Sequence, residues 1–223
     1  MAREPFVLAI ASHKGGTGRT TTACALAWLW GQAGLRVALA DADPVRAARL
    51  IATDGGGECP WDNVRYFDGL PEPDSGADLV IADCPSLMDA AVEPVLRHCH
   101  SVVLTCVADP LSLRTVPAAA RVLATARVSN PRLELLGVLI GLYNSLDVIQ
   151  APMLGKLRQM HGDLLLTPPI PYDPGIRDWA ANPGSPLPVS RAADAFASVG
   201  DQIADVVQRT HGHNLFAVRA GGD

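Results

Sequence analysis

A glycine-rich segment near the start of the chain constrains its fold more than any other part of the sequence. Residues 12–21 read S-H-K-G-G-T-G-R-T-T, between an apolar run at residues 6–11 and an alanine- and leucine-rich stretch at residues 22–33. This order predicts a strand, a tight loop and a helix. Such a loop turns successive backbone N–H groups toward one point at the positive end of the helix dipole, where the phosphates of a nucleotide bind. The sequence therefore predicts a phosphate-binding loop in an α/β fold.

The loop departs from the common pattern G-x-x-x-x-G-K-[ST] at two positions. His13 stands where the first glycine is expected, and Arg19 stands where the lysine is expected, whereas a lysine occurs earlier, at Lys14. A guanidinium is wider than an ammonium and planar, so it cannot enter the same gap without shifting the phosphates. We expect Arg19 to allow ATP binding and to slow hydrolysis or reshape the site.

Short β-rich runs alternate with helical patterns along the rest of the chain. This alternation predicts βα units and a mostly parallel twisted sheet with helices on both faces. Strands are expected at residues 6–12, 36–41, 64–67, 79–83, 101–106, 135–142 and 164–167, and helices at residues 20–33, 46–52, 88–98, 112–128, 150–161 and 191–210. With 223 residues and 48% hydrophobic content, the chain is expected to form one domain over residues 1–211, followed by a flexible tail at 212–223.

The pattern K-G-G-x-G-[K]-T-T that begins at Lys14 resembles the deviant Walker A loop of the ParA/MinD family of partitioning and positioning ATPases. Five further blocks are similar to motifs of that family and occur in the same order, at residues 37–44, 79–86, 108–114, 136–140 and 170–178. Six blocks spread over roughly residues 6–190 would not arise from a chance match of the loop alone. The resemblance implies a P-loop NTPase fold and a short ParA-like ATPase, with ATP and Mg²⁺ as cofactors.

Phosphoryl transfer needs positive charge near the γ-phosphate, because negative charge moves toward the leaving oxygens as the P–O bond lengthens. By resemblance, Lys14 would supply that charge across the interface of an ATP-dependent homodimer. Asp43 is the family's candidate for orienting the attacking water. On the magnesium side we expect the hydroxyl of Thr20, the carboxylate of Asp83 acting through water, and Asp41 as a helper.

The remaining nucleotide-binding residues fall into two groups. The phosphates would contact Lys14, Gly15, Gly16, Thr17, Gly18, Arg19, Thr20 and Thr21. By resemblance, Leu142, Pro171 and Asp173 would surround the adenine. The segment N-S-L-D at residues 144–147 is faintly similar to the N-K-x-D guanine reader of related GTPases but lacks its lysine, and an Asn/Asp pair in a loop usually forms a turn. The sequence thus favours ATP over GTP.

The resemblance also implies three kinds of partner: a second copy of the chain, nonspecific DNA and a ParB-like or other activating protein. With 18 basic and 23 acidic residues the net charge is −5, so DNA binding would need a local patch. Arg114, Arg121 and Arg127 recur about every seven residues on one expected helix, and Arg177 and Arg191 are further candidates; solvated helix arginines are the alternative interpretation.

No membrane association is expected, because the last expected helix carries acids and few bases, unlike a basic amphipathic anchor. The apolar stretches also fall short of the ~20 residues of a bilayer span. The expected location is the cytoplasm, on the nucleoid when ATP is bound.

Two other functions fit parts of the sequence. A nucleotide-gated regulator or scaffold would result if Arg19 slowed or abolished hydrolysis. An iron–sulfur carrier of the related iron-protein group would need paired cysteines, and the five cysteines form no C-x-x-C pair. The histidines at residues 98, 100, 211 and 213 lack a second ligand pair at the spacing of a closed zinc site.

Overall fold

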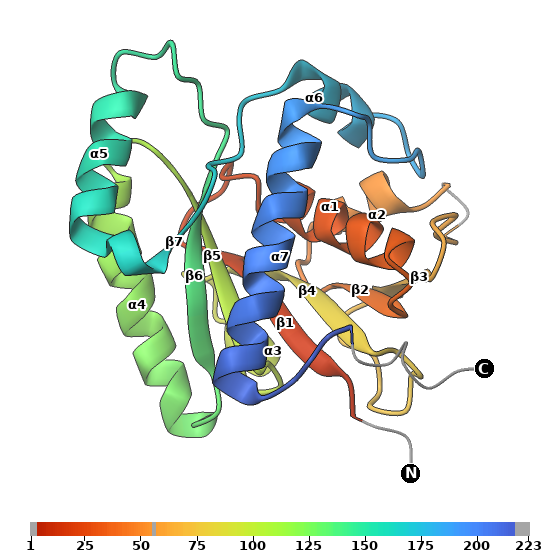
Figure 1. Cartoon of the computed structure of the whole chain (residues 1–223). Helices are drawn as coiled ribbons and strands as arrows, with labels where there is room; N and C mark the ends of the chain where they lie inside the picture. Colours follow the sequence, from red (N-terminus) through yellow and green to blue (C-terminus); the bar gives the residue numbers. More distant parts are fainter. Residues whose placement is uncertain (1–3, 55–56, 217–223) are drawn as a thin grey trace.

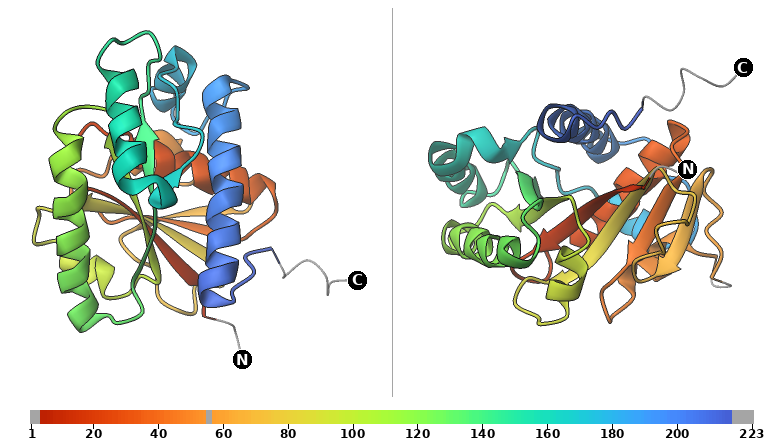
Figure 2. Two further views of the ribbon diagram at one scale, coloured as in Figure 1. Left: turned by 60° about the vertical axis from the view of Figure 1, so that its left-hand side comes forward. Right: turned by 90° about the horizontal axis from the view of Figure 1, so that it is seen from below.

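The computed structural model describes residues 4–54 and 57–216 and contains a parallel seven-stranded sheet with helices on both faces (Figures 1 and 2). The strand order is β3-β2-β4-β1-β5-β6-β7, and every pairing is parallel. The strands are β1 (Phe6–Ser12), β2 (Val37–Asp41), β3 (Val64–Asp68), β4 (Leu79–Ser86), β5 (Ser101–Val107), β6 (Glu134–Gly141) and β7 (Leu165–Leu166). The helices are α1 (Arg19–Gln32), α2 (Ala47–Ala52), α3 (Val92–Leu96), α4 (Ser112–Ser129), α5 (Gln150–His161), α6 (Pro174–Ala180) and α7 (Arg191–His211), with a 3₁₀ turn at Gly162–Leu164.

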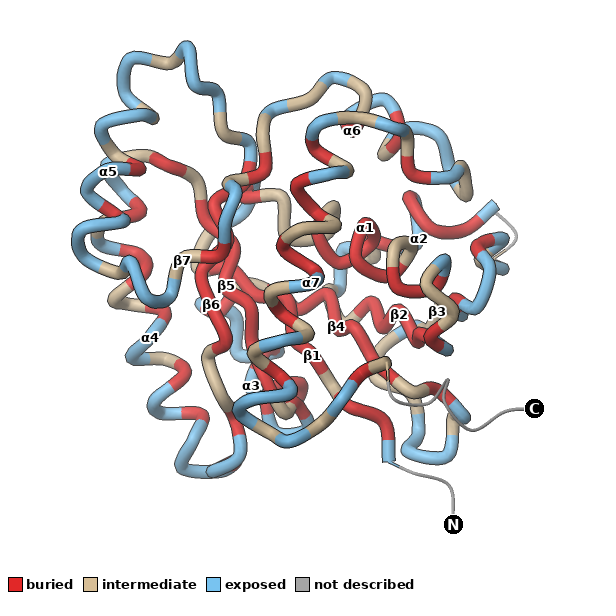
Figure 3. The backbone as a smooth tube through the Cα atoms, viewed as in Figure 1, coloured by how far each residue is buried: buried red, intermediate tan, exposed pale blue. Residues whose placement is uncertain are grey.

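The apolar core forms two layers, one on each face of the sheet. Alternate residues of β1 point to opposite faces, so that Leu8 and Ile10 pack with α1, α2, α6 and α7, whereas Ala9 and Ala11 pack with α3, α4 and α5. Strands covered on both faces read as continuous apolar runs, which is why they were predictable from the sequence. Figure 3 shows β1, β2, β4 and β5 as almost uniformly buried.

The sheet topology places the glycine-rich loop at the point where the strand order reverses. From β1, in the middle of the sheet, the chain first runs to β2 on one side and later, through β4, to β5 on the other side. In open parallel sheets, ligands bind at the carboxyl ends of the strands near such a reversal. The loop after β1 lies there.

The structure differs from the sequence prediction in several elements. β4 extends to Ser86 instead of ending at residue 83, and α3 spans only Val92–Leu96 instead of residues 88–98. Helix α6 was missed, although its start carries a proline at the first position and an N-cap, since the side chain of Asp173 accepts a hydrogen bond from Gly175 N. A short helix that begins with Pro-Gly gives a weak periodic signal.

The chain remains packed beyond the predicted domain end at residue 211. Leu215 is 3% exposed and belongs to the core, and the ring of His213 lies 5.1 Å from that of Phe6. Residues 217–223, the rest of the predicted tail, lie outside the described residues. Over the described parts of the chain, no helix combines the length and the hydropathy needed to cross a membrane.

Candidate functional site

The loop between β1 and α1 has the backbone that its glycines predict. Gly16 and Gly18 have φ angles of 73° and 82°, which only glycine adopts readily, and Gly18 is the residue directly before α1. A Cβ atom at Gly15, Gly16 or Gly18 would meet no other atom within 4 Å, so the space beside the loop is open. Helix α1 begins without a side-chain cap and without an acidic residue in its first turn. Its first amides are therefore available to an anion.

Three strands hold this loop in place. Thr17 is 2% exposed, and its hydroxyl lies 2.8 Å from that of Thr105 on β5. Ser86, at the end of β4, donates a hydrogen bond of 3.0 Å to the carbonyl of His13. At the end of β6 the backbone of Gly141 comes so close to the loop that an added Cβ would lie 2.5 Å from the Thr17 carbonyl oxygen. The loop is thus fixed by packing as well as by hydrogen bonds.

The side chain of Arg19 is held by carboxylates in this structure. Its Nε donates to Asp83 Oδ1 at 3.0 Å, its Nη2 forms a short ion pair with Asp43 Oδ2, and its Nη1 donates to Ser12 Oγ at 3.3 Å. The side chains of Arg19 and Asp43 are each 13% exposed, and that of Asp83 is fully buried. The sequence predicted Arg19 as a phosphate ligand and did not anticipate these partners, which lie 24 and 64 residues away.

Two buried carboxylates, Asp41 at the end of β2 and Asp83 within β4, retain oxygens without a hydrogen-bond partner. Asp41 and Asp83 are paired in the register of these strands and both are fully buried, and Asp41 Oδ1 and Asp83 Oδ2 have no partner among the residues that the structure describes. Burial raises the pKa of Asp83 to about 6, although the charge of Arg19 and the hydroxyl of Thr20 oppose the shift. Burial also raises the pKa of Asp41, whose other oxygen accepts from Arg49 N at 3.1 Å.

These oxygens fit a hydrated magnesium ion better than a closed metal site. Among the described residues, no three His, Cys, Asp or Glu side chains converge to hold a metal. Mg²⁺ usually keeps several waters and takes one or two protein oxygens, and buried carboxylate oxygens without partners can accept from such waters. The candidate residues are the predicted ones, Thr20, Asp41 and Asp83. Asp43, the predicted water-orienting residue, also accepts from Val45 N at 2.9 Å.

Lys14 forms an ion pair within its own chain. Its Nζ lies 2.5 Å from Asp109 Oδ2, and both side chains are about one-third exposed, at 28% and 32%. Asp109 follows β5 and also accepts from the backbone N–H and the hydroxyl of Ser112, both at 2.8 Å, at the start of α4. Partial burial would raise the pKa of Asp109, but the hydrogen bonds from Lys14 and Ser112 outweigh it and lower the pKa. In this conformation Lys14 is connected to the start of α4.

A cavity of about 220 Å³ adjoins the loop. Gly18, Thr21 and Thr22 line one side of it. The predicted base-contacting residues Leu142, Pro171 and Asp173 line it as well, together with side chains that were not predicted to contact the base, namely Ile170, Tyr172, Ile176, Ala180 and Phe196. Ile176 and Ala180 lie on α6 and Phe196 lies on α7, and only the tertiary packing of these helices brings them to the loop.

Two details of this cavity differ from the simple prediction. The carboxylate of Asp173 caps α6 by accepting from Gly175 N at 2.8 Å, so it is already engaged. Arg177, predicted for a DNA surface, lines the cavity and pairs with Asp178. Leu142 has a φ of 53°, a conformation that costs a branched side chain free energy and that occurs often at functional sites.

The segment of residues 144–147 forms turns. Asn144 Oδ1 accepts from Leu146 N at 3.0 Å, and Asp147 Oδ1 accepts from Ile149 N at 2.8 Å. Both side chains therefore close local turns, as expected for an Asn/Asp pair in a loop. They offer no support for a guanine-reading motif.

The predicted arginine stripe is only partly free. Arg127 pairs with Glu134 and donates to the carbonyl of Leu133, so it fixes the end of α4 to β6. Arg114, Arg121 and Arg191 are exposed and form no ion pair with any residue in the described ranges. Those three remain candidates for contact with a polyanion.

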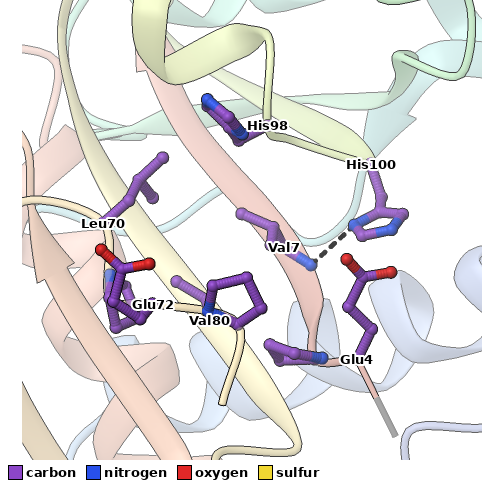
Figure 4. A pocket seen from close by; sticks show the side chains of 10 residues that line it. Glu4, Val7, Leu70, Glu72, Val80, His98 and His100 are labelled. Atoms are coloured by element: carbon purple, nitrogen blue, oxygen red, sulfur yellow. Dashed lines mark hydrogen bonds between the residues drawn. The ribbon is translucent and has the colours of Figure 1, made fainter. Parts of the chain in front are cut away.

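A second cavity, of about 330 Å³, lies beside the amino end of β1 (Figure 4). His98, His100, Glu4 and Glu72 line it together with prolines. His100 Nδ1 accepts from Val7 N at 3.0 Å, its ring stacks on Phe6, and burial lowers its pKa. His211 is engaged with Ser101 Oγ at 2.8 Å. These histidines thus serve packing and hydrogen bonding where the structure describes them.

The cysteines offer no exposed pair for a cluster. Cys24, Cys84, Cys99 and Cys106 are buried and Cys59 is half-buried, all as free thiols. Burial raises the pKa of Cys99 and of Cys106 to about 12, which disfavours the thiolate that iron requires. The structure thus argues against the iron–sulfur alternative.

Comparison with known proteins gives a family match over most of the chain. The family model described as the CobQ/CobB/MinD/ParA nucleotide binding domain matches residues 8–186. The chain is 27% identical over 239 aligned positions to the chromosome-partitioning ATPase Soj of Thermus thermophilus, which covers 90% of this chain and 96% of that protein. It is 29% identical over 141 positions to the maintenance of carboxysome distribution protein A of Halothiobacillus neapolitanus, covering 60% of this chain and 65% of that protein.

A solved structure shares the fold at low sequence identity. Cobyrinic acid a,c-diamide synthase of Mycobacterium smegmatis, with bound ADP and magnesium, superposes with a TM-score of 0.68 at 22% identity. The match covers 94% of this chain and 97% of that one.

Proposed function

Because this chain belongs to the CobQ/CobB/MinD/ParA nucleotide-binding domain family, we propose that it is a ParA-like, Mg²⁺-dependent ATPase that positions or segregates a cargo. In this proposal ATP binding joins two copies of the chain, the dimer binds nonspecific DNA, and a partner protein resets it by stimulating hydrolysis. The cargo is a plasmid, a chromosome or a protein assembly.

One observation carries the nucleotide-binding part of the proposal. The glycine-rich loop and the cavity that Leu142, Pro171 and Asp173 line are continuous, because Gly18 and Thr21 belong to both. An anionic group can thus lie on the loop amides while a planar apolar group enters the cavity between Leu142 and Pro171. A nucleotide has this combination of parts.

The residues around the loop then have separate roles. The loop amides from Gly15 to Arg19 hold the phosphates, and the hydroxyl of Thr20 and the carboxylates of Asp83 and Asp41 hold magnesium, directly or through water. When bound, the metal neutralises charge on the phosphate oxygens. Asp43 accepts a hydrogen bond from the attacking water and orients it. Lys14 leaves Asp109 and places its ammonium beside the γ-phosphate of the partner copy.

The distribution of exposed apolar side chains supports a second copy as the partner at this face. Large apolar side chains stand exposed in the loops that follow the carboxyl ends of β2, β4, β5, β6 and β7: Val45, Met88, Leu111, Leu146, Val148 and Tyr172, between 51% and 89% exposed. These loops stand at the same ends of the strands as the glycine-rich loop. Exposed apolar side chains at one end of a sheet support a surface there that another molecule covers.

The DNA-binding and cargo parts of the proposal depend on the relatives and on three arginines. Soj is named for chromosome partitioning, and the second relative for carboxysome distribution, which both concern the placement of a cargo. Exposed Arg114, Arg121 and Arg191 can contact phosphates although the whole chain has a net charge of −5.

A second candidate function follows from the contacts of Arg19. Because its guanidinium binds Asp43 and Asp83, the two carboxylates expected to act in hydrolysis are already neutralised. A chain that keeps these contacts with ATP bound would act as a nucleotide-gated scaffold with slow or absent turnover.

Phosphate release measured with Mg²⁺ and ATP separates the two candidates. The ATPase proposal predicts measurable release by the wild-type protein and faster release with DNA and a partner protein. The scaffold function predicts tight ATP binding without release, and Arg19→Lys would then raise turnover strongly. Failure of the wild-type protein to bind ATP or ADP in the presence of Mg²⁺ would contradict both.

A further inference from the structure

We propose that Arg19 is the internal counter-ion of Asp43 and Asp83, and that a nucleoside polyphosphate competes with these carboxylates for its guanidinium. This inference rests on the proposed function, because it concerns the regulation of the same site. It adds that nucleotide affinity is limited by the free energy needed to detach Arg19.

The contacts of Arg19 use the full width of its planar group. Nε reaches Asp83 on β4, Nη2 reaches Asp43 beyond the end of β2, and Nη1 reaches Ser12 on β1. These three strands are neighbours in the sheet, so the guanidinium lies across their carboxyl ends. A lysine ammonium is a single point charge and cannot hold both carboxylates in this arrangement. The arginine that breaks the usual loop pattern is therefore what makes the double contact possible.

The surroundings of Arg19 make these contacts strong and specific. Its side chain is 13% exposed and its partner Asp83 is fully buried, so solvent ions screen the pairs little. Arg19 is also the first residue of α1, where the helix dipole disfavours a cation. No acidic residue stands in the first turn of α1, so the two carboxylates at the strand ends supply the compensating charge.

A polyphosphate on the loop changes this balance. The negative charges of the polyphosphate attract the same guanidinium. The N–H donors of Arg19 cannot point to the loop and to the two carboxylates at the same time. Once Arg19 leaves, the charges of Asp43 and Asp83 are uncompensated, and Asp83 Oδ2 already lacks a hydrogen-bond partner within the described ranges of the chain. Another cation must then replace the lost charge. Nucleotide binding without Mg²⁺ should consequently be weak in the wild-type protein, since no replacement is available.

A double-mutant cycle with magnesium-free ADP tests the inference by isothermal titration calorimetry in EDTA. Asp43→Asn removes one competitor for Arg19, so ADP affinity should rise roughly tenfold, which corresponds to about 1.4 kcal/mol. In the Arg19→Met background the same substitution should change affinity by less than about twofold. Equal gains in both backgrounds would reflect only the loss of a negative charge near ADP and would overturn the inference.

Two further variants sharpen the test. Asp78→Asn breaks the ion pair between Arg36 and Asp78, which directly precede β2 and β4. This variant should leave ADP affinity unchanged. Arg19→Lys keeps the positive charge but cannot hold both carboxylates, so it should bind magnesium-free ADP several-fold more tightly than the wild type. If it binds no more tightly, the inference is wrong while the proposed function stands. Failure of the wild type to bind ADP even with Mg²⁺ would contradict the proposed function itself.

Discussion

Asp83 is the residue whose environment most affects the pH dependence of this protein. Its carboxyl group is fully buried within β4, and burial raises its pKa to about 6 despite the neighbouring Arg19. In an unfolded chain the pKa of an aspartate is about 3.9. At pH values between these two pKa values, Asp83 carries a proton in the folded protein but not in the unfolded chain.

The stability of the folded protein should therefore depend on the ionisation of Asp83. The contribution of Asp83 to stability is fully present below pH of about 4 and is lost as the pH rises through about 6, because ionisation is disfavoured in the folded state. The free energy of unfolding of the wild type, relative to that of the Asp83→Asn variant, should fall by roughly 2–3 kcal/mol between about pH 4 and pH 7. Urea denaturation at several pH values measures it, and a difference that does not change with pH would contradict the prediction.

The sequence predicted which residue types gather at the site, but it did not predict which side chains form pairs with each other. The glycines of the loop and the early Lys14 were readable from short motifs, and so was Asp83 as a residue of an apolar strand, although that strand continues to Ser86. The contact of Lys14 with Asp109 joins positions 95 residues apart, and only the sheet order brings β1 and β5 together. Such pairings depend on tertiary packing, so no local pattern could reveal them.

At the scale of elements, the end of β6 supports the phosphate loop. The backbone of Gly141 approaches the Thr17 carbonyl so closely that no side chain fits between them. The loop itself makes few other packing contacts on its open side, where Gly15 and Gly16 are exposed. The position of the loop amides should therefore depend on this contact.

Gly141→Ala tests that dependence. The added methyl group would lie 2.5 Å from a backbone oxygen, so either the loop or β6 must shift. We expect a loss of about 1–3 kcal/mol in the free energy of unfolding and weaker binding of Mg²⁺-ADP. Gly155→Ala in α5 is the matched control, because its Cβ would meet no atom within 4 Å. If Gly141→Ala binds nucleotide as tightly as Gly155→Ala, the loop does not depend on β6.

The elements themselves were predictable where they are long and covered on both sides. All seven strands were expected, although β3 mixes polar and apolar residues and β7 has only two residues. Among the short helices, α2 was expected, α3 was overestimated and α6 was missed, because helices of 5 to 7 residues contain too few turns to show a reliable periodic pattern. The missed helix contributes Ile176 to the cavity beside the loop, so the base-contacting part of the site was predicted less completely than the phosphate-contacting part.

At the scale of the whole molecule, the features of the site converge on one face. The loop, the carboxylates, the cavity and the six exposed apolar side chains named above belong to segments at or near the carboxyl ends of the strands. Lys14 is held there by a single carboxylate that is about one-third exposed, and partly solvated ion pairs of this kind contribute about 1 kcal/mol. A second copy that presents a triphosphate can therefore draw Lys14 away at little cost.

Sedimentation velocity with Mg²⁺ and a nonhydrolysable ATP analogue is the most direct test of the proposed ATP-dependent dimer and of the role of Lys14 in it. The wild-type protein should sediment as a dimer with the analogue and as a monomer with ADP. Lys14→Ala should stay monomeric with the analogue bound and lose a factor of about 10³ in turnover. Lys156→Ala, which removes the chain's other lysine from exposed α5, should behave as the wild type. A wild-type protein that binds the analogue and remains a monomer, or a Lys14→Ala variant that dimerises normally, would contradict the account.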